Sequence, residues 1–125
     1  MINTLRSLFL CLMFISPVFA SEQAYTQAVF DKLIQQGQPV LVSIHADWCP
    51  TCRAQAPVLS KLLKQNEYQK INALRVDFDQ QKDVLKALKV DRQSTLIVFK
   101  AGQEVGRSLG DTSEDAIAAL LKKAL

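Results

Sequence analysis

The segment HADWCPTC, residues 45–52, decides how this sequence is interpreted. It contains the only Trp, the only His and two of the three Cys residues, Cys49 and Cys52. The branched apolar run before it, PVLVSI (39–44), predicts a buried strand, and helical spacing of apolar residues returns from 50 to about 67. A Cys-x-x-Cys pair between a strand and a helix is the context in which this motif indicates redox chemistry.

Composition and length predict one globular domain. The chain has 125 residues, of which 49% are hydrophobic and 22% are charged, which is the usual mixture of a folded soluble domain. Its formal net charge is only +3, and the basic residues are scattered along the chain. This charge gives no indication of nucleic-acid binding.

The first twenty residues differ from the rest. Segment 1–20 carries one charged side chain, Arg6, then an apolar run and a Ser-Pro breaker, which predicts a signal peptide cleaved after Ala20. An uncleaved membrane anchor is the alternative, but the apolar stretch of about 13 residues is shorter than the ~20 needed to span a bilayer. We therefore expect an exported domain, 21–125, without stable membrane insertion. Cleavage would remove Cys11 with the leader.

The two remaining cysteines are better suited to chemistry than to stabilising the fold, because closing so small a loop removes little chain entropy. We expect Cys49 at the N-cap of a helix, where free N–H groups and the helix dipole favour its thiolate. Cys49 would then attack a disulfide, and Cys52, buried deeper about one turn later, would resolve the mixed disulfide. Pro50 at the first helical position costs no hydrogen bond. Pro50 and Thr51 would shape the helix start and tune the thiolate.

The rest of the chain alternates helical and strand patterns. The predicted elements are a helix over 21–37 capped by Ser21, strands over 71–79, 95–99 and 104–109, a helix over 80–90 capped by Asp79, and a C-terminal helix capped by Asp111, Thr112 or Ser113. Gly106 would weaken the last strand or mark a bulge. This order predicts an α/β fold with a mixed sheet of about four strands and helices on both faces.

At this point the residues resemble a known family. WCPTC (48–52), with PVLVSIHAD before it and RAQAPVL after it, resembles the thioredoxin superfamily, and STLIVFKAGQEVGRSLG (94–110) resembles the hairpin beyond its active-site loop. The resemblance covers about residues 23–125, and Pro57 matches the family's kinking proline. It implies a central mixed sheet flanked by helices, here without the usual first strand, because the mature chain begins with a predicted helix.

The resemblance also implies a function. The Pro-Thr dipeptide resembles exported members that serve cytochrome c maturation, which leads us to expect a periplasmic thiol–disulfide oxidoreductase. Its partners would be protein thiols and disulfides, and a reductase in that compartment would need electrons from a membrane partner. We expect a monomer that needs no organic cofactor. The sequence does not decide between oxidase and reductase.

Three positions depart from the family pattern. Ser94 stands where the family places a cis-proline, and we expect a trans bond there because a non-proline cis bond costs about 2.5–4 kcal/mol. Ser43 stands where thioredoxins bury an acid, and His45 replaces an aromatic residue. Since positions 43 and 45 share a strand face, His45 is a candidate for proton transfer to or from Cys52.

Other side chains near the motif have lesser expected roles. Trp48 is expected to cover and contact the disulfide, Asp47 to be a solvated loop acid, and Arg75, where the family often has Lys, to be either a site residue or an ordinary strand charge. The residues expected to shape the site are Trp48, Pro50, Thr51, Pro57 and Ser94.

Two other functions are compatible with the sequence. In the first, Cys49, Cys52 and His45 bind a soft metal ion, although three ligands are too few for a closed tetrahedral site. In the second, the domain is a non-catalytic binding module, which the presence of both cysteines disfavours.

Overall fold

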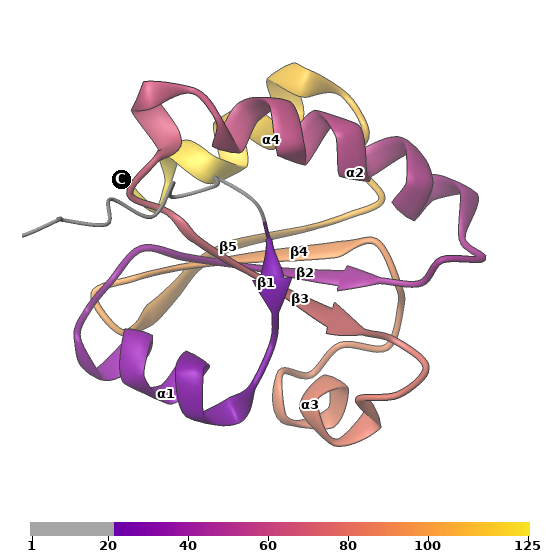
Figure 1. Ribbon diagram of the computed structural model, residues 1–125, viewed down its shortest axis with the longest axis horizontal. Coiled ribbons are helices and arrows are strands. Elements are labelled where there is room, and N and C mark those ends of the chain that lie inside the picture. The colour runs from indigo at the N-terminus through magenta and orange to yellow at the C-terminus, as the bar shows by residue number, and fades with distance from the viewer. Residues whose placement is uncertain (1–21) are drawn as a thin grey trace, which may run out of the picture.

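The computed structural model describes residues 22–125. The predicted leader, its cleavage after Ala20 and the proposed Ser21 cap lie outside the described residues. Five strands form one mixed sheet in the order β1-β3-β2-β4-β5, with α2 and α4 on one side and α1 and α3 on the other (Figure 1). This arrangement confirms the predicted α/β class and the mixed sheet.

The elements alternate along the chain much as expected. The strands are β1 (Gln23–Ala24), β2 (Val40–His45), β3 (Asn72–Asp77), β4 (Thr95–Lys100) and β5 (Gln103–Leu109). The helices are α1 (Gln27–Gln35), α2 (Pro50–Leu63), α3 (Lys82–Ala87) and α4 (Glu114–Lys122), with a short 3-10 turn, η1 (Asn66–Tyr68), after α2. Helix α2 thus ends about four residues earlier than predicted, and Pro57 lies inside it.

The register of the sheet brings the functional segments together. Strand β2 runs parallel to β3, from Val40 opposite Asn72 to His45 opposite Asp77, and antiparallel to β4. Strands β4 and β5 form the predicted hairpin, and their register shifts next to Gly106. The shift confirms the bulge that this glycine suggested.

The N-terminal segment corrects the sequence prediction. Residues Gln23–Ala24 form the first strand, which pairs in parallel with β3, so the family strand expected to be missing is present and the sheet has five strands. Helix α1 begins only at Gln27, where the Thr26 hydroxyl accepts a hydrogen bond from the Val29 N–H at 3.2 Å. A two-residue strand has too few residues to show an apolar alternation, so only its pairing with β3 reveals it.

Two helix caps test the sequence rules further. Ser113 caps α4, as one of the predicted alternatives, by accepting the Ala116 N–H at 3.2 Å. The predicted Asp79 cap is wrong, because Gln81 occupies the N-cap of α3 without a side-chain hydrogen bond. The Asp79 carboxylate instead accepts a hydrogen bond from Trp48, so a contact between distant segments replaces the local cap.

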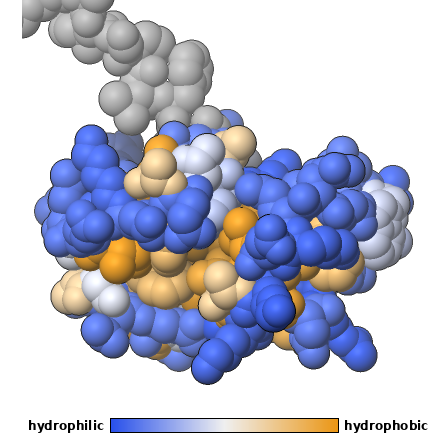
Figure 2. Space-filling view, turned by 90° about the horizontal axis from the view of Figure 1, so that it is seen from below, coloured by the Kyte–Doolittle hydropathy of each residue, from blue (hydrophilic) through white to orange (hydrophobic). Residues whose placement is uncertain are grey.

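The hydrophobic core has two layers, one on each face of the sheet. Leu41, Ala73, Leu96 and Val98 pack against α2 and α4 through Leu59, Leu62, Ile117 and Leu121. Val42, Ile44, Leu74, Val76 and Ile97 pack on the other side with Phe30 and Leu33 of α1 and Leu85 of α3. On that side, hydrophobic surface shows in the middle of the face, between hydrophilic side chains (Figure 2).

The alternation along β2 positions the site. Leu41 lies in the layer under α2, so Ser43 and His45, at the same parity, point toward α2 as well. The α2 face of the sheet is therefore apolar at one end and polar near the cysteines. Within the described residues, every helix is too short or too polar to cross a membrane.

Candidate functional site

The cysteine pair lies where β2 gives way to α2. Cys49 is the N-cap of α2, and its sulfur accepts a hydrogen bond from the Cys52 N–H at 3.2 Å. Pro50 is the first helical residue, so it replaces an N–H that has no partner within the helix. The structure therefore confirms the predicted helix start. The structure describes the two cysteines without a disulfide between them, and they are 2% and 1% exposed, so Cys52 is only marginally the more buried.

The surroundings of the two sulfurs separate their pKa values. Burial opposes ionisation of Cys49, but hydrogen bonds from Cys52 and Ser94, and from the N–H groups of Cys52 and Thr51, outweigh it and lower the pKa of Cys49 from 9.0 to about 7. Burial, together with the hydrogen bond to Cys49 and the charge of its thiolate, raises the pKa of Cys52. Cys49 is therefore the sulfur that ionises first and is the better candidate for the attacking thiolate.

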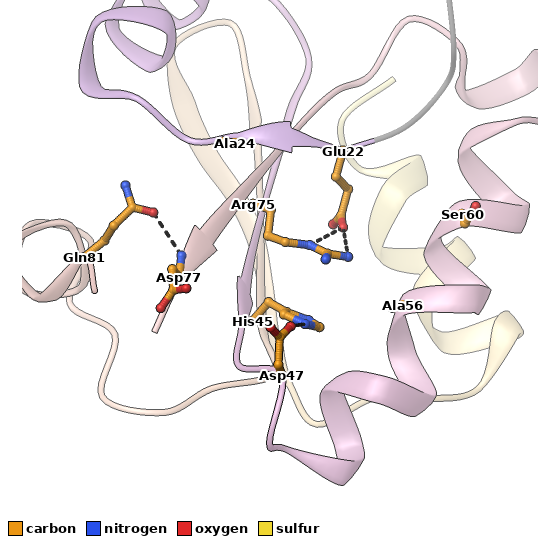
Figure 3. A pocket seen from close by; sticks show the side chains of 9 residues that line it. All are labelled: Glu22, Ala24, His45, Asp47, Ala56, Ser60, Arg75, Asp77 and Gln81. Atoms are coloured by element: carbon orange, nitrogen blue, oxygen red, sulfur yellow. Dashed lines mark hydrogen bonds and ion pairs between the residues drawn. The ribbon is translucent and has the colours of Figure 1, made fainter. Parts of the chain in front are cut away.

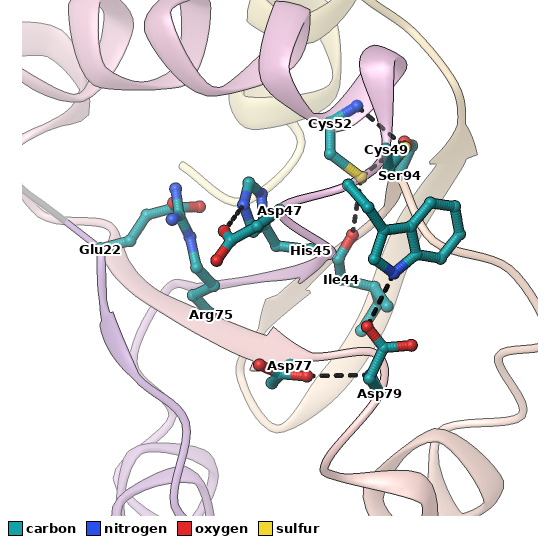
Figure 4. A network of polar contacts seen from close by, with 11 residues as sticks. Glu22, Ile44, His45, Asp47, Cys49, Cys52, Arg75, Asp77, Asp79 and Ser94 are labelled. Atoms are coloured by element: carbon teal, nitrogen blue, oxygen red, sulfur yellow. Dashed lines mark hydrogen bonds and ion pairs between the residues drawn. The ribbon is translucent and has the colours of Figure 1, made fainter.

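Among the residues expected to shape the site, Ser94 has a hydroxyl within hydrogen-bond distance of both sulfurs. Its hydroxyl oxygen lies 3.0 Å from the Cys52 sulfur and 3.4 Å from the Cys49 sulfur, and the residue is 2% exposed (Figure 4). Its peptide bond is trans, as expected, and its φ of 62° lies in the left-handed region. A polar group therefore occupies the position where the family pattern would place a proline ring.

The backbone of Ser94 is held in place by several hydrogen bonds. Its N–H donates to the Ile44 carbonyl at 2.8 Å, and its carbonyl accepts from the Gly110 N–H at 3.0 Å. The buried side chain of Gln55 donates to the carbonyls of Ser94 and Asp111, at 3.4 and 2.8 Å. Sequence reasoning missed Gln55, because a lone Gln in a helix gives no sign of a partner 39 residues away.

Trp48 is held beside the cysteines but is not buried. Its indole N–H donates to the Asp79 carboxylate at 2.7 Å, and its ring meets Phe78 edge-on with centroids 6.5 Å apart. The side chain is nevertheless 57% exposed. Trp48 therefore presents a fixed aromatic surface next to Cys49, while its expected contact with the disulfide stays a prediction.

The His45 ring is bonded to a loop acid rather than to a sulfur. Its Nε2 lies 2.9 Å from the carboxylate of Asp47, a fully exposed loop acid as expected. Among residues 22–125, no hydrogen bond joins His45 to Cys49 or Cys52. Proton transfer by His45 stays a prediction that would need an intervening water or a movement of the ring.

The metal-binding alternative needs Cys49, Cys52 and His45 to lie together. In the part of the chain that the structure describes, no group of three or more His, Cys, Asp or Glu side chains is placed to hold a metal ion. His45 is bonded to Asp47, and the polar side chain within hydrogen-bond distance of both sulfurs is Ser94. The geometry therefore favours the thiol chemistry.

A second polar group lies on the β3 side of β2, on the same face of the sheet as α2, and we call it the carboxylate cluster: Glu22, Ser43 and Arg75. The Glu22 carboxylate accepts hydrogen bonds from the Ser43 hydroxyl and from Arg75, whose Nε and Nη2 lie 2.8 and 2.6 Å away. The Glu22 side chain is only 8% exposed. An acid from outside the strand thus reaches Ser43, where the family pattern would bury one. Sequence reasoning missed Glu22 because it was assigned to a helix.

The carboxylate cluster borders a pocket under α2. The pocket has a volume of about 430 Å³, and Figure 3 shows the side chains that line it. They are Glu22, Ala24, His45, Asp47, Ala56, Ser60, Arg75, Asp77 and Gln81. Small side chains on α2 and polar ones on the sheet leave this space open next to the redox site, but neither cysteine lines it.

The fold and the site together define a thioredoxin-like α/β protein, and comparisons with known proteins agree. A model of the thioredoxin family matches residues 21–123. The crystal structure of Trxlp from Edwardsiella tarda is 42% identical with a TM-score of 0.79, covering 81% of this chain and 98% of that one. Thioredoxin-1 of Saccharomyces cerevisiae is 34% identical over 88 residues, covering 70% of this chain and 84% of that protein.

This chain covers only part of a further relative. Mitochondrial thioredoxin of Mus musculus is 31% identical over 93 residues, which are 74% of this chain and 55% of that protein. The chain thus spans about half the length of this relative. On the family match, this chain belongs to the thioredoxin family.

Proposed function

We propose that this protein is a thiol–disulfide oxidoreductase that exchanges its Cys49–Cys52 dithiol or disulfide with cysteine pairs of other proteins. The observation that carries the proposal is the Cys49 sulfur at the N-cap of α2, where hydrogen bonds lower its pKa to about 7. At neutral pH a large fraction of this thiol is ionised, and the thiolate is the form that attacks disulfides. The family of the chain supports the same chemistry.

The reaction runs in two exchange steps. The Cys49 thiolate attacks one sulfur of the partner's disulfide, a Cys49–partner disulfide forms, and the other partner sulfur leaves as a thiolate that takes up a proton. Cys52 then loses its proton and attacks the Cys49 sulfur, which forms the intramolecular disulfide and releases the second partner thiolate. The partner is reduced by two electrons and the protein is oxidised by two. The reverse sequence would oxidise a partner.

An insulin-reduction assay with a dithiol reductant tests the activity. We expect insulin precipitation to be accelerated by the wild-type domain and not by Cys49→Ser or Cys52→Ser. Metal analysis of anaerobically purified protein should accompany the assay. A stoichiometric metal together with no acceleration would replace the proposal with the metal-binding function.

The reduction potential of the cysteine pair decides the direction of exchange. The reduction potential of the Cys49–Cys52 pair, measured in glutathione buffers, would place the protein between the roughly −270 mV of a reductase and the roughly −120 mV of a strong oxidase. A value near the lower end would require a supply of electrons in an oxidising compartment, for which a membrane partner is the proposed source. We also propose that the domain acts as a monomer.

We propose a periplasmic location on the leader-like composition of residues 1–20. Mass spectrometry of a periplasmic fraction should find a mature N-terminus at Ser21. Full-length protein in the membrane fraction would favour the anchor instead. This outcome would change the location without affecting the chemistry of the cysteines.

A further inference from the structure

The Ser94 hydroxyl is the one uncharged side-chain group that the described structure places within hydrogen-bond distance of both sulfurs. Its oxygen lies 3.0 Å from the Cys52 sulfur and 3.4 Å from the Cys49 sulfur. Cys49, Cys52 and Ser94, which we call the sulfur cluster, are each no more than 2% exposed. Bulk water therefore has little access to these atoms, so the Ser94 hydroxyl is the polar group at hand for both sulfurs.

A serine hydroxyl suits a position between two thiols that ionise in turn. It has one O–H donor and two acceptor lone pairs, and its hydrogen moves by rotation about one bond. When Cys49 is ionised, the Ser94 hydroxyl can donate to its thiolate, in addition to the hydrogen bond that the Cys52 thiol donates to the same sulfur. When Cys49 carries no charge, the same hydroxyl can turn toward Cys52. No heavy atom has to move between the two arrangements.

We propose that Ser94 is a catalytic residue whose hydroxyl donates a hydrogen bond first to the Cys49 thiolate and then, in the mixed disulfide, to the Cys52 thiolate. The inference rests on the proposed thiol–disulfide exchange and assigns a residue to both of its steps. Ser94 keeps its own proton throughout. The proton of Cys52 leaves to solvent or to the departing thiolate, and Ser94 stabilises the charge that remains on sulfur.

The sulfur pKa values agree with this assignment. The hydrogen bond from Ser94 is one of the interactions that lower the pKa of Cys49, and at Cys52 it opposes the rise caused mainly by burial. The resolving thiol is the one whose ionisation is costly, so a donor at 3.0 Å acts where it is needed most.

The backbone that carries the hydroxyl does not depend on it. The Ser94 N–H and carbonyl are bonded to Ile44 and Gly110, and Gln55 also reaches the carbonyl. A proline at this position would lack the N–H and could not adopt a φ of 62°. Removing only the hydroxyl therefore leaves the scaffold of the loop intact, which makes the proposal open to a clean test.

The test uses three variants. Ser94→Ala removes the hydroxyl and keeps a side chain at the same φ, and Ser94→Gly removes it while also relieving the left-handed backbone. Thr95→Val is the matched control, because this neighbouring hydroxyl is also buried but donates to the Arg92 carbonyl at 2.8 Å. The free energy of unfolding of each reduced variant shows whether the domain is intact.

The reagent is dithiobis(nitrobenzoate), whose two coloured thiolates report the two steps separately. The first is released when Cys49 attacks, and the second when Cys52 resolves the mixed disulfide. Both rates are followed as a function of pH. The other titratable or charged groups in the surrounding segments, His45, Asp47, Arg53, Asp79, Arg92 and Asp111, are retained in every variant.

We expect both Ser94 variants to raise the apparent pKa of each phase by about one unit, the effect of losing roughly one hydrogen bond to a charged group. At neutral pH the release phase should slow by only about threefold, because a more basic thiolate is also a better nucleophile. The deficit should disappear at alkaline pH, where the thiolate forms without the hydroxyl. A merely loosened site would instead be slow at every pH.

The outcomes separate this inference from the proposed function. If wild-type protein exchanges disulfides but both Ser94 variants keep the wild-type pH profile, Ser94 is not catalytic and the proposed function stands. If Thr95→Val shifts the profile as much as Ser94→Gly, the effect belongs to the loop and the inference is wrong. If wild-type protein releases no second thiolate, the proposed function itself fails. Should Ser94→Ala not fold, Ser94→Gly decides alone.

Discussion

The carboxylate cluster lies on the β3 side of β2 and the sulfur cluster on its β4 side. Figure 4 shows Glu22 and Arg75 of the first, and Cys49, Cys52 and Ser94 of the second. Both are built around a serine hydroxyl, Ser94 in one and Ser43 in the other, and both contain largely buried polar atoms. In the carboxylate cluster, Glu22 is bonded to Ser43 and to Arg75, and each member finds its partner within the group. In the sulfur cluster, the partners of the hydroxyl are two thiols that react.

This difference indicates how the roles of the two serines diverge. A buried hydroxyl that is bonded to a carboxylate has a fixed donor role, since the carboxylate only accepts. A hydroxyl between two thiols can reverse its donor direction as the protonation of the sulfurs changes. We therefore expect changes in the sulfur cluster to alter rates, and changes in the carboxylate cluster to alter stability.

The largest effects should come from the sulfurs themselves. Cys49→Ser should abolish exchange, because a serine hydroxyl is not ionised at neutral pH and does not attack disulfides. Cys52→Ser should instead accumulate the mixed disulfide at Cys49, since attack is intact but resolution is lost. Mass spectrometry after mixing with an excess of a small disulfide distinguishes the two. A stable adduct on Cys52 in Cys49→Ser, formed at the wild-type rate, would reverse the roles.

Alkylation should separate the two sulfurs by pH. A pKa of about 7 leaves Cys49 roughly half ionised at pH 7, against about 1% for a thiol with a pKa of 9.0, a difference of roughly fiftyfold. Iodoacetamide should therefore label Cys49 first, with a half-maximal rate near pH 7, while labelling of Cys52 is delayed to higher pH. Peptide mapping of the labelled protein identifies the site, and earlier labelling of Cys52 would contradict the assignment.

The same ionisation should make stability depend on pH. Cys52→Ser keeps a hydroxyl donor in place of the thiol, so we expect the Cys49 pKa to stay lower in the folded than in the unfolded chain. The unfolded chain of the reduced variant then binds more protons between about pH 7 and 9. The free energy of unfolding should therefore rise across that range, and the gain should be lost as pH falls through about 7. A Cys49→Ser, Cys52→Ser double variant is the control and should lack this rise.

Glu22→Gln should reduce stability with little effect on rate. The amide can still accept from Ser43 but no longer neutralises Arg75, whose side chain is 38% exposed, so we expect a loss of about 1–2 kcal/mol. Glu114→Gln is the matched control, because its ion pair with Lys61 at 2.7 Å is exposed and should contribute less than about 0.5 kcal/mol. Urea unfolding measures both. Slower exchange in Glu22→Gln, with unchanged stability, would connect the two clusters functionally.

His45→Phe should have the smallest effect. We expect it to slow release of the mixed disulfide by about threefold and to leave its formation unchanged, well below the hundredfold or more that a directly placed general base contributes. The reason is that Nε2 is bonded to Asp47 and not to a sulfur. Asp47→Asn is the companion variant, because it removes the carboxylate that holds the His45 ring. Unchanged release in both would reduce His45 to a packing residue.

The redox motif could be predicted from sequence because its geometry is local. A branched apolar run, a short loop and a helix with Pro50 at its first position fix where Cys49 and Cys52 lie, and the structure confirms the N-cap. The hairpin and its bulge at Gly106 were also predictable. In each case the residues that decide the conformation are neighbours along the chain.

The start of the fold was predicted wrongly for the opposite reason. The helical pattern predicted from residue 21 included Gln23–Ala24. These two residues form a strand only because they pair with the edge of β3. That pairing carries Glu22 to Ser43 and Arg75, which are 21 and 53 residues away in the sequence. No local pattern indicates such a contact.

The sequence by itself therefore determined the family, the cysteine pair and the helix that Cys49 caps. It also identified Ser94 as a departure, but not what its hydroxyl touches. The contacts of Ser94 with Cys49 and Cys52 join residues 45 and 42 positions apart. They exist because β4 pairs antiparallel with β2, which brings the residue before β4 beside the end of β2 and the start of α2. Strand order and direction are set by burying both sheet faces at once, so only the tertiary structure decides them.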